Sequence, residues 1–353
     1  MPVLTRLIPS PVVVDIRAGA LDDLAVVLAD QRISSSGRLA VAVSGGSGQV
    51  LRERLAPALP GAEWFEVAGG TIDGAVGLAE AMRGKRYDAV VALGGGKIID
   101  AAKYAAARVG LPVVAVATNL AHDGLCSPVS TLDNDNGRGS YGVPSPIAMV
   151  IDLDVVREAP ARFVRSGIGD AISNISCIAD WELSHRETGE PIDGLAAAMA
   201  RTAGESVLRH PGGIGDDEFL TVLAEALVLT GIAMSISGDS RPASGACHEI
   251  SHAIDLLHPR RAAAHGEQVG IGAAFAMFLR GAEEQSKLFA ETLRTHGLPV
   301  TPGEIGFTED EFVEAVAYAP QTRPGRYTIL EHLELSTDEI RDAYADYAKT
   351  IGS

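Results

Sequence analysis

The sequence predicts an α/β domain built on a parallel sheet, followed by an all-α domain. Short apolar runs alternate with helical patterns in the first half of the chain, and long helical patterns replace them after about residue 160. Glycine is frequent, at 39 residues, whereas aromatic residues make up only 5% of the chain. A chain of 353 residues is long enough for two domains, each with its own core.

Four runs predict the strands of the sheet, at residues 39–43, 88–93, 112–117 and 147–151. They are apolar nearly throughout, as expected for parallel strands that are covered on both faces. Residues 97–109 carry apolar positions at helical spacing and are followed by Gly110 and Pro112, so they predict the helix of one βαβ unit. The polar stretch 133–140 predicts an exposed hairpin or loop.

The second half predicts long helices, for example at 216–236 and 269–279. We expect the boundary within residues 163–167, which gives domains of 1–163 and 164–353. The cleft between two such domains is the default place for a ligand.

Composition and charge exclude several classes of function. A net charge of −17 disfavours non-specific binding to nucleic acid or anionic lipid, because both need a basic surface. Three cysteines without C-x-x-C spacing predict neither a disulfide framework nor a cysteine zinc site, and they fit a reducing cytoplasm. Residues 1–6 do not resemble a secretory signal, and the apolar windows are interrupted before about 18 residues, so we expect no transmembrane span.

A glycine turn, Gly94-Gly95-Gly96-Lys97, directly follows a predicted strand and opens a helix that carries Asp100 in its first turn. Glycines allow close approach of a pyrophosphate, and the helix N-terminus offers free N–H groups. The turn is not G-x-G-x-x-G, and the alternative is a tight turn that binds no ligand. A second glycine cluster, at 44–48, has Ser where an acidic residue would hold the ribose 2′-hydroxyl, so both NAD and NADP stay open. Its alternative is a plain surface turn.

Four residues are candidates for a divalent metal site. His248 and His252 stand four apart on a predicted helix, His265 follows a polar link, and Asp170 lies near the predicted start of another helix. Two imidazoles and a carboxylate around an open position describe a catalytic metal site, and the H-x-x-x-H spacing permits two ligands or one ligand and one proton carrier. The alternatives are structural histidines and a helix-capping Asp170.

Residues 248–252 read H-E-I-S-H, which also matches the zinc-protease pattern H-E-x-x-H. The glycine turn and the parallel sheet argue against a protease, because such an enzyme has no use for a dinucleotide-binding domain.

Five motifs in order resemble the glycerol-1-phosphate dehydrogenases, a branch of the iron-containing alcohol dehydrogenases, over about residues 35 to 280. They are Gly94–Asp100, Ala121–Gly124 with Ser127-Pro128, Gly167–Asn174, Ser240–His248 and His265–Gly270. The resemblance implies a dehydroquinate synthase-like fold, in which a Rossmann-like domain precedes a helical one. It implies a cytoplasmic enzyme and a homo-oligomer.

The resemblance also implies roles for single residues. It places the metal, zinc or alternatively Fe²⁺ or Ni²⁺, on Asp170, His248 and His265, with Asn174 where iron-type relatives have a fourth ligand. It places NAD or NADP on Gly94, Gly95, Gly96, Lys97, Asp100, Thr118 and Ser127. His252 and Asp123 are the implied catalytic residues.

The implied reaction is the reduction of dihydroxyacetone phosphate to sn-glycerol 1-phosphate. Arg241, Arg260 and Arg261 are candidates for binding the phosphate, unless they are ordinary surface arginines. The sequence departs from the family at Ala117, Asn119-Leu120 and Glu249, so the substrate stays open. The alternatives are a glycerol or other polyol dehydrogenase, a dehydroquinate synthase-like cyclase, for which Lys is sparse in the helical half, and a binding protein without metal.

Overall fold

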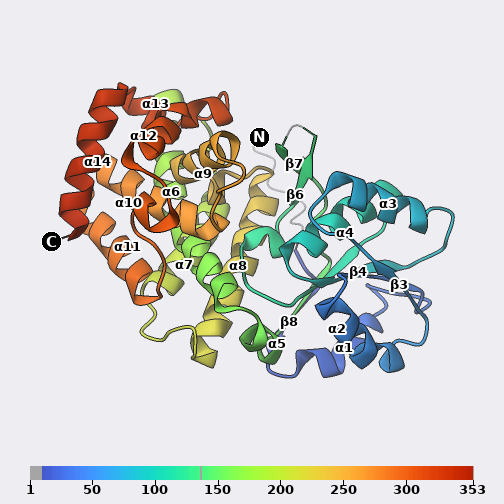
Figure 1. The fold of residues 1–353 in the computed structure, drawn as a ribbon. Coiled ribbons are helices and arrows are strands. Elements are labelled where there is room, and N and C mark those ends of the chain that lie inside the picture. The colour runs from blue at the N-terminus through green and yellow to red at the C-terminus, as the bar shows by residue number, and fades with distance from the viewer. Residues whose placement is uncertain (1–9, 136, 353) are drawn as a thin grey trace, which may run out of the picture. The chain divides into compact units, whose positions relative to one another are not determined.

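The computed structural model describes residues 10–135 and 137–352 (Figure 1). The chain forms two compact units, Met1–Pro160 and Ala161–Ser353. The start of the chain, for which the sequence predicted no secretory signal, lies outside the described residues, as does Asn136 in the predicted hairpin.

The first unit is built on a six-stranded sheet, and its strand pairs are all parallel in the order β1-β8-β5-β4-β2-β3. The four predicted strands are confirmed, and they are buried at every residue. The sequence missed the two edge strands, because charged residues interrupt their apolar runs. The bounds are β1 (Val13–Arg17), β2 (Leu39–Val43), β3 (Ala62–Glu66), β4 (Ala89–Gly94), β5 (Val113–Ala117) and β8 (Ala148–Asp152).

Helices cover both faces of this sheet. Alternate strand residues such as Val41 and Val91 join Leu24 and Leu55 in one core cluster, so α1 and α2 cover that face. The other face meets α4, against which α3 packs, and both helices lie on the opposite side of the sheet in Figure 1. The bounds are η1 (Ala20–Asp23), α1 (Leu24–Leu28), α2 (Ser47–Leu55), η2 (Ala56–Ala58), α3 (Ile72–Met82), α4 (Gly96–Val109), η3 (Asp123–Leu125) and α5 (Leu153–Glu158).

The predicted hairpin is confirmed on the described residues. Strands β6 (Val129–Asn134) and β7 (Gly137–Gly142) pair in antiparallel fashion, and β6 packs against α4. The helix predicted at 97–109 is also confirmed, since α4 ends at Gly110 in the left-handed conformation, with φ of +71°.

The second unit is helical, as predicted, and the residues expected to hold the boundary, 163–167, lie within its first helix. Its central helix, α10, packs against α6, α9 and α11. The bounds are α6 (Ala161–Thr188), α7 (Gly194–Leu208), α8 (Asp217–Ser237), η4 (Arg241–Ala243), α9 (Ala246–Leu257), α10 (His265–Leu279), α11 (Glu283–Thr295), η5 (Pro302–Ile305), α12 (Glu309–Tyr318), η6 (Ala319–Thr322), α13 (Ile329–Leu333) and α14 (Thr337–Gly352).

Two glycines allow α6 and α10 to touch backbone to backbone. A Cβ on Gly266 would come closer than 3.0 Å to the carbonyl oxygen of Ser166, and a Cβ on Gly169 would come equally close to the carbonyl oxygen of Gly266. Real Cβ atoms do not approach so closely. Both positions therefore require glycine, and this contact brings the neighbouring residues Asp170 and His265 together.

Helix α8 is the described helix that comes closest to a membrane span, although Glu225 and Gly231 interrupt its apolar run. This helix has 21 residues and a mean hydropathy of 2.0 over 18 of them, which is long and apolar enough to cross a membrane by length and composition. However, 67% of that window is buried inside the protein. Packing within the fold accounts for most of the apolar surface of α8.

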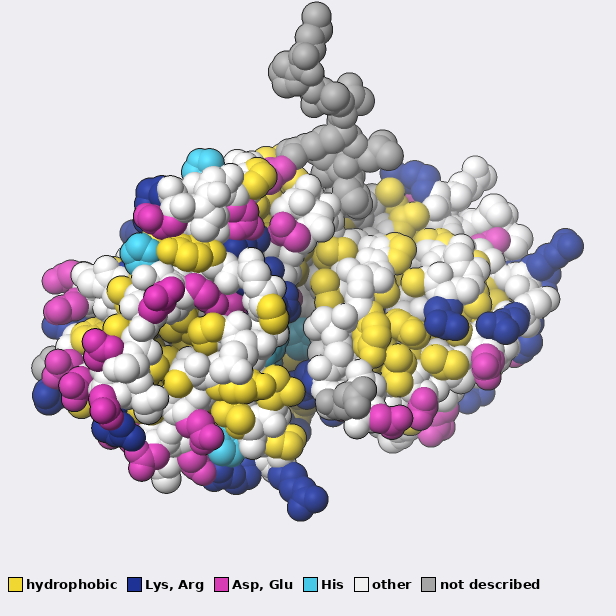
Figure 2. Space-filling model, turned by 90° about the horizontal axis from the view of Figure 1, so that it is seen from above, with side chains coloured by type: hydrophobic (Ala, Val, Ile, Leu, Met, Phe, Trp, Pro, Cys, Tyr) yellow, Lys and Arg dark blue, Asp and Glu magenta, His cyan; other side chains and the backbone are white. Residues whose placement is uncertain are grey.

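Charged side chains of both signs are mixed on the molecular surface. On the face drawn in Figure 2, Asp and Glu are interspersed with Lys and Arg rather than separated into acidic and basic areas. This face therefore offers no broad basic area of the kind that binds nucleic acid.

Candidate functional site

The predicted glycine turn joins the carboxyl end of β4 to the N-terminus of α4. Gly95 is the N-cap of α4, and no side chain caps this helix. The backbone N–H of Thr118, just after β5, donates to the carbonyl oxygen of Gly94 at 3.1 Å. The turn therefore lies where adjacent parallel strands end, which is the usual place for a ligand in an open α/β sheet.

Two side chains that follow β5 close over this turn. A Cβ on Gly95 would come closer than 3.0 Å to the side-chain amide of Asn119, and a Cβ on Gly96 would come equally close to the imidazole of His122. The Oδ1 atom of Asn119 is buried and has no hydrogen-bond partner among the described residues. A narrow glycine turn beside an unpaired acceptor fits a bound dinucleotide.

A buried lysine that the sequence did not single out organises the adjoining loop. Lys103 has no exposed surface, and its Nζ donates to the carbonyl oxygens of Gly124 (2.7 Å), Ser127 (3.2 Å) and Val129. It also lies 3.0 Å from Asp100 Oδ1, in an ion pair rather than an aligned hydrogen bond. An ammonium group so buried needs such partners.

This network bears on two predicted cofactor contacts. Asp100 neutralises Lys103, and the Ser127 hydroxyl donates to the carbonyl oxygen of Val129 at 3.3 Å. Both side chains therefore have partners within the protein. The other predicted residues of this unit are more accessible: Lys97 is exposed on the first turn of α4, and Thr118 and Asp123 are half-buried.

The second glycine cluster lies beside a carboxylate that the sequence did not reveal. Glu66 is the last residue of β3, and its Oε1 would lie 2.8 Å from a Cβ placed on Gly45. Its other oxygen accepts a hydrogen bond from Gln49 Nε2 at 2.8 Å. Although Ser44 follows β2, the neighbouring strand β3 supplies an acidic group at the same turn.

In the helical unit, the three predicted metal ligands converge from three helices. Asp170 of α6 places its Oδ1 at 3.8 Å from His248 Nε2 of α9 and at 3.5 Å from His265 Nε2 of α10. Atoms bound tetrahedrally at about 2.0–2.2 Å from one ion lie about 3.3–3.6 Å apart, so these side chains fit a small divalent cation. The Asp170 side chain is 3% exposed and that of His265 is 29% exposed, which leaves the group accessible from the His265 side.

The surroundings of the two imidazoles suit metal binding. Burial lowers the pKa of His248 well below its ordinary value, and the charge of His265 acts in the same direction, while Asp170 opposes both. The Ser251 hydroxyl donates to Gln268 Oε1 at 2.6 Å, so its oxygen can accept from His265 Nδ1, 3.4 Å away. His265 then presents the lone pair of Nε2 toward Asp170.

Sequence comparisons place this geometry in a family. The family of iron-containing alcohol dehydrogenases matches residues 15–160. The chain is 36% identical over 350 residues to a glycerol-1-phosphate dehydrogenase (NAD(P)+) of Hyperthermus butylicus, with 98% of each chain covered. It is 39% identical over 264 residues to the enzyme of the same name from Pyrococcus abyssi, with 74% of each chain covered. The chain belongs to the glycerol-1-phosphate dehydrogenase family.

Solved structures show the same fold at lower identity. A probable glycerol dehydrogenase of Sinorhizobium meliloti superposes with a TM-score of 0.79 at 23% identity, and 99% of each chain is covered. The glycerol dehydrogenase of Schizosaccharomyces pombe superposes with a TM-score of 0.78 at 21% identity, covering 99% of this chain and 91% of its own. The predicted dehydroquinate synthase-like fold of the glycerol-1-phosphate dehydrogenase family is thus confirmed.

In this glycerol-1-phosphate dehydrogenase family member, Asp170 is not a helix cap. It is the tenth residue of α6, because the helix begins at Ala161 rather than near Gly167 as the sequence predicted. Four residues later, Asn174 donates its side-chain amide to Thr230 Oγ1 at 2.8 Å. Asn174 therefore joins α6 to α8 and leaves the three-residue metal group unchanged.

The zinc-protease pattern at 248–252 does not form a protease site. Among the described residues, His248 groups with His265 and Asp170 rather than with His252. The Glu249 carboxyl is buried and accepts a hydrogen bond from Thr328 Oγ1 at 3.1 Å. Burial, followed by the charges of Glu331 and Asp180, raises the pKa of Glu249 to about 8. His252 remains half-buried on α9, one turn after His248.

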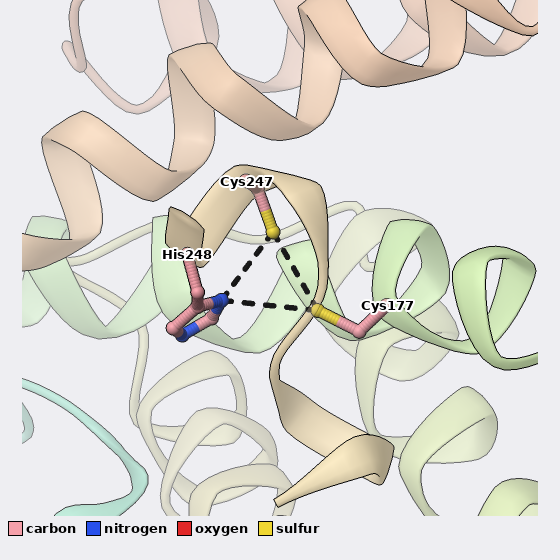
Figure 3. A group of neighbouring side chains, drawn as sticks. All are labelled: Cys177, Cys247 and His248. Carbon is pink, nitrogen blue, oxygen red and sulfur yellow. Dashed lines mark hydrogen bonds between the residues drawn. The ribbon is translucent and has the colours of Figure 1, made fainter. Parts of the chain in front are cut away.

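The other edge of the His248 ring faces two thiols, an arrangement that the sequence did not predict (Figure 3). Its Nδ1 lies 3.4 Å from Cys247 Sγ and 3.8 Å from Cys177 Sγ, and the two sulfur atoms are 3.5 Å apart. All three residues are buried. Burial raises the pKa of Cys177 well above its ordinary value, and Cys247 acts in the same direction.

Two arginines predicted as phosphate-binding candidates already hold carboxylates. Arg241 is buried, pairs with Glu190 and donates to the carbonyl oxygen of Tyr327 at 3.0 Å. Arg261 is exposed and pairs with Glu311 at 2.5 Å. The third candidate, Arg260, is exposed in the turn after α9.

Proposed function

We propose that this protein is a metal-assisted, NAD(P)-linked dehydrogenase that interconverts dihydroxyacetone phosphate and sn-glycerol 1-phosphate. The convergence of Asp170, His248 and His265 at 3.5–3.8 Å carries the proposal. It occurs in a chain that covers 98% of a relative named for this activity. A binding protein without metal would have no need for this donor set.

The helical unit, proposed as residues 164–353, is assigned to metal and substrate. Nitrogen and oxygen donors with an open position favour zinc, with Fe²⁺ and Ni²⁺ as alternatives. When bound, such a cation supplies Lewis-acid stabilisation of the substrate oxygen, and NAD(P) carries the hydride. Ser251 and Gln268 hold His265 in the orientation that binding requires.

His252 is assigned to proton transfer. It lies one turn after His248 on α9 and is half-buried, so it is near the metal group without belonging to it. Oxidation of a secondary alcohol releases a proton from its hydroxyl group, and reduction of the ketone takes one up. A neutral imidazole can hold and release that proton near physiological pH.

The sheet unit, proposed as residues 1–163, is assigned to the dinucleotide. Gly94–Gly96 offer the pyrophosphate turn, and Asn119 Oδ1 supplies a buried acceptor beside it. Lys97 and Thr118 are proposed to line the site and Asp123 to act as a catalytic residue, whereas Asp100 and Ser127 shape the site through Lys103. The Glu66 carboxylate favours NAD over NADP, because it would repel a ribose 2′-phosphate. The cytoplasm and a homo-oligomer are proposed as the setting of the enzyme.

An absorbance assay of NADH and NADPH oxidation tests the function. We expect turnover of dihydroxyacetone phosphate, its loss with a chelator and its return with Zn²⁺. Turnover of dihydroxyacetone at least as efficient as that of its phosphate would replace the proposal with a polyol dehydrogenase. No chelator-sensitive turnover of any carbonyl compound would refute the dehydrogenase proposal.

A further inference from the structure

Two arginines of the C-terminal region, Arg323 and Arg326, share one acceptor in the helical unit. Arg323 Nη1 and Arg326 Nη2 each donate to Ser240 Oγ at 3.1 Å. Arg326 also donates to the carbonyl oxygen of Ser244. The segment after η6 is thereby held against residues 240–245, the link between α8 and α9.

Both guanidinium groups lack a counter-ion. Among the residues that the structure describes, neither has a carboxylate within the ion-pairing distance of 4.0 Å, in contrast to Arg241, which pairs with Glu190. Both side chains are only partly exposed. Burial lowers the pKa of both, that of Arg326 to about 10, and the positive charge of Arg323 adds to the effect on Arg326. Two adjacent, partly desolvated cations without an anion are costly unless an anionic ligand binds them.

A further polar group at this place has no partner. Ser244 is 4% exposed, and its buried Oγ has no hydrogen-bond partner among the described residues. Ser244 is the residue whose carbonyl oxygen accepts from Arg326, so its free hydroxyl belongs to the same cluster. Native proteins rarely leave a buried hydroxyl unsatisfied without a ligand or water.

The cluster lies beside the metal group. The positive charge of Arg323 lowers the pKa of His248, after the larger effects of burial, His265 and His252 in the same direction. Residues 240–245 lead directly into α9, which carries His248 in its first turn. An anion bound by Arg323 would therefore be near the cation-binding side chains.

We propose that Arg323 and Arg326, with Ser240 and Ser244, form the binding site for the phosphate group of the substrate. This inference rests on the proposed function and names the residues that distinguish a phosphate ester from a plain ketone. Two planar guanidinium forks and two hydroxyls match the oxygens of a phosphate monoester dianion. These residues are proposed in place of the earlier phosphate candidates Arg241 and Arg261, because those two are already paired with carboxylates.

The competing explanation is a purely structural clamp, in which the arginines only join the two segments. The carboxyl groups of Glu249, which raises the pKa of both arginines, and of Asp239, which raises that of Arg326, would then compensate their charge. A clamp stabilises the fold for every substrate equally. A phosphate site affects only substrates that carry the phosphate.

Arg323→Gln and Arg326→Gln, assayed with their metal, separate the two explanations. We expect kcat/KM for dihydroxyacetone phosphate to fall about 10- to 100-fold in each variant, because charge-assisted hydrogen bonds are lost. The value for dihydroxyacetone should stay within about twofold. Arg261→Gln, which removes an exposed and paired guanidinium, is the control and should change neither value. Equal losses for both substrates would overturn the proposal.

Calorimetric titration with inorganic phosphate gives a readout independent of turnover. We expect the unmodified holoenzyme to bind phosphate and Arg323→Gln to bind it about 10- to 100-fold more weakly. Unchanged affinity, or no binding to the unmodified enzyme, would overturn the site. Arginine-dependent binding by an enzyme that does not turn over dihydroxyacetone phosphate would sustain the anion site and reject the proposed function. If the glutamine variants do not fold, Arg323→Lys and Ser244→Ala make the same comparison.

Discussion

Cys247 and His248 face each other through Sγ and Nδ1 at 3.4 Å, while the Nε2 of the same ring lies 3.8 Å from Asp170 Oδ1. Two potential metal groups therefore share one imidazole, since Cys177, Cys247 and His248 also form a compact set of donors. A ligating imidazole ordinarily binds through one nitrogen and keeps a proton on the other. The two groups are thus alternatives, and burial, which raises the pKa of the Cys177 thiol, favours the group with Asp170.

Removal of single ligands distinguishes the two groups. We expect Asp170→Ala and His265→Ala to lose the bound metal, because each removes one of three ligands. Cys177→Ala should keep it, since the thiol serves only as a neighbour of His248 Nδ1. Metal content per chain, measured by mass spectrometry after dialysis, is the readout. Loss of metal from Cys177→Ala with retention in Asp170→Ala would assign the ion to the thiol group.

The hydroxyl that orients His265 should tune metal affinity. Ser251→Ala removes the acceptor 3.4 Å from His265 Nδ1, and we expect a decrease of about 10- to 100-fold in zinc affinity. Ser286→Ala is a matched control. The Ser286 hydroxyl is buried and donates to the carbonyl oxygen of Ala274, which lies on α10, the helix that carries His265. Competition with a chromophoric chelator measures both. Equal affinities in the two variants would show that Ser251 does not position the ligand.

The sequence predicted the interior of the fold better than its edges or its polar networks. Continuous apolar runs revealed β2, β4, β5 and β8, whereas β1 and β3 carry charged residues on exposed positions and gave no such run. Local patterns also identified the candidate ligands. Their convergence depends on Gly169 and Gly266, where two backbones touch, and this contact between residues 97 positions apart leaves no local pattern.

The same limit applies to the polar partners. Lys103 lies within a helical pattern, and only the fold shows that it holds the carbonyl groups of residues 124–129. Glu66 follows an edge strand without a recognisable motif, although its carboxylate reaches Gly45. Arg323 and Arg326 were not predicted for the same reason, since their shared acceptor, Ser240, lies more than 80 residues earlier.

His252 should affect turnover without affecting the metal. His252→Gln removes the proposed proton carrier while His248, one turn earlier, keeps its contacts. We expect kcat to fall by about 10²- to 10⁴-fold, the usual contribution of general acid–base catalysis, with full metal content. The dependence of kcat on pH should flatten over the range in which imidazole titrates. An unchanged kcat and pH profile would dismiss His252 as the proton carrier.

The free energy of unfolding should depend on pH through the carboxyl group of Asp88. Its carboxylate accepts hydrogen bonds from Ser34 Oγ (2.7 Å) and from both the hydroxyl and the N–H of Ser36 (2.8 Å each). The Ser34 hydroxyl first, and then the groups of Ser36, hold the pKa of Asp88 well below its usual 3.8. Because the folded pKa is the lower one, this stabilisation is complete above pH 3.8 and is lost as the pH falls through the folded value.

Asp88→Asn should therefore destabilise the protein by about 1–2 kcal/mol at pH 7, after allowance for solvent screening. The difference from the unmodified protein should shrink at pH 3. Urea unfolding at both pH values measures it. A loss of the same size at pH 3 and pH 7 would mean that the charge of Asp88 contributes nothing.

Glu66 should determine the preference between the two dinucleotides. Its carboxylate adjoins Gly45, which follows β2. Strand β2 lies next to β4, the strand that carries the Gly94–Gly96 turn. Glu66→Gln keeps an acceptor for Gln49 but removes the negative charge that would repel a ribose 2′-phosphate. We expect the ratio of kcat/KM for NADPH to that for NADH to rise about 10-fold. Glu63 lies on β3, as Glu66 does, and pairs with Lys85. Glu63→Gln makes the same charge change and should leave the ratio unchanged. If both variants shift the ratio equally, the effect comes from net charge, and Glu66 does not select the cofactor.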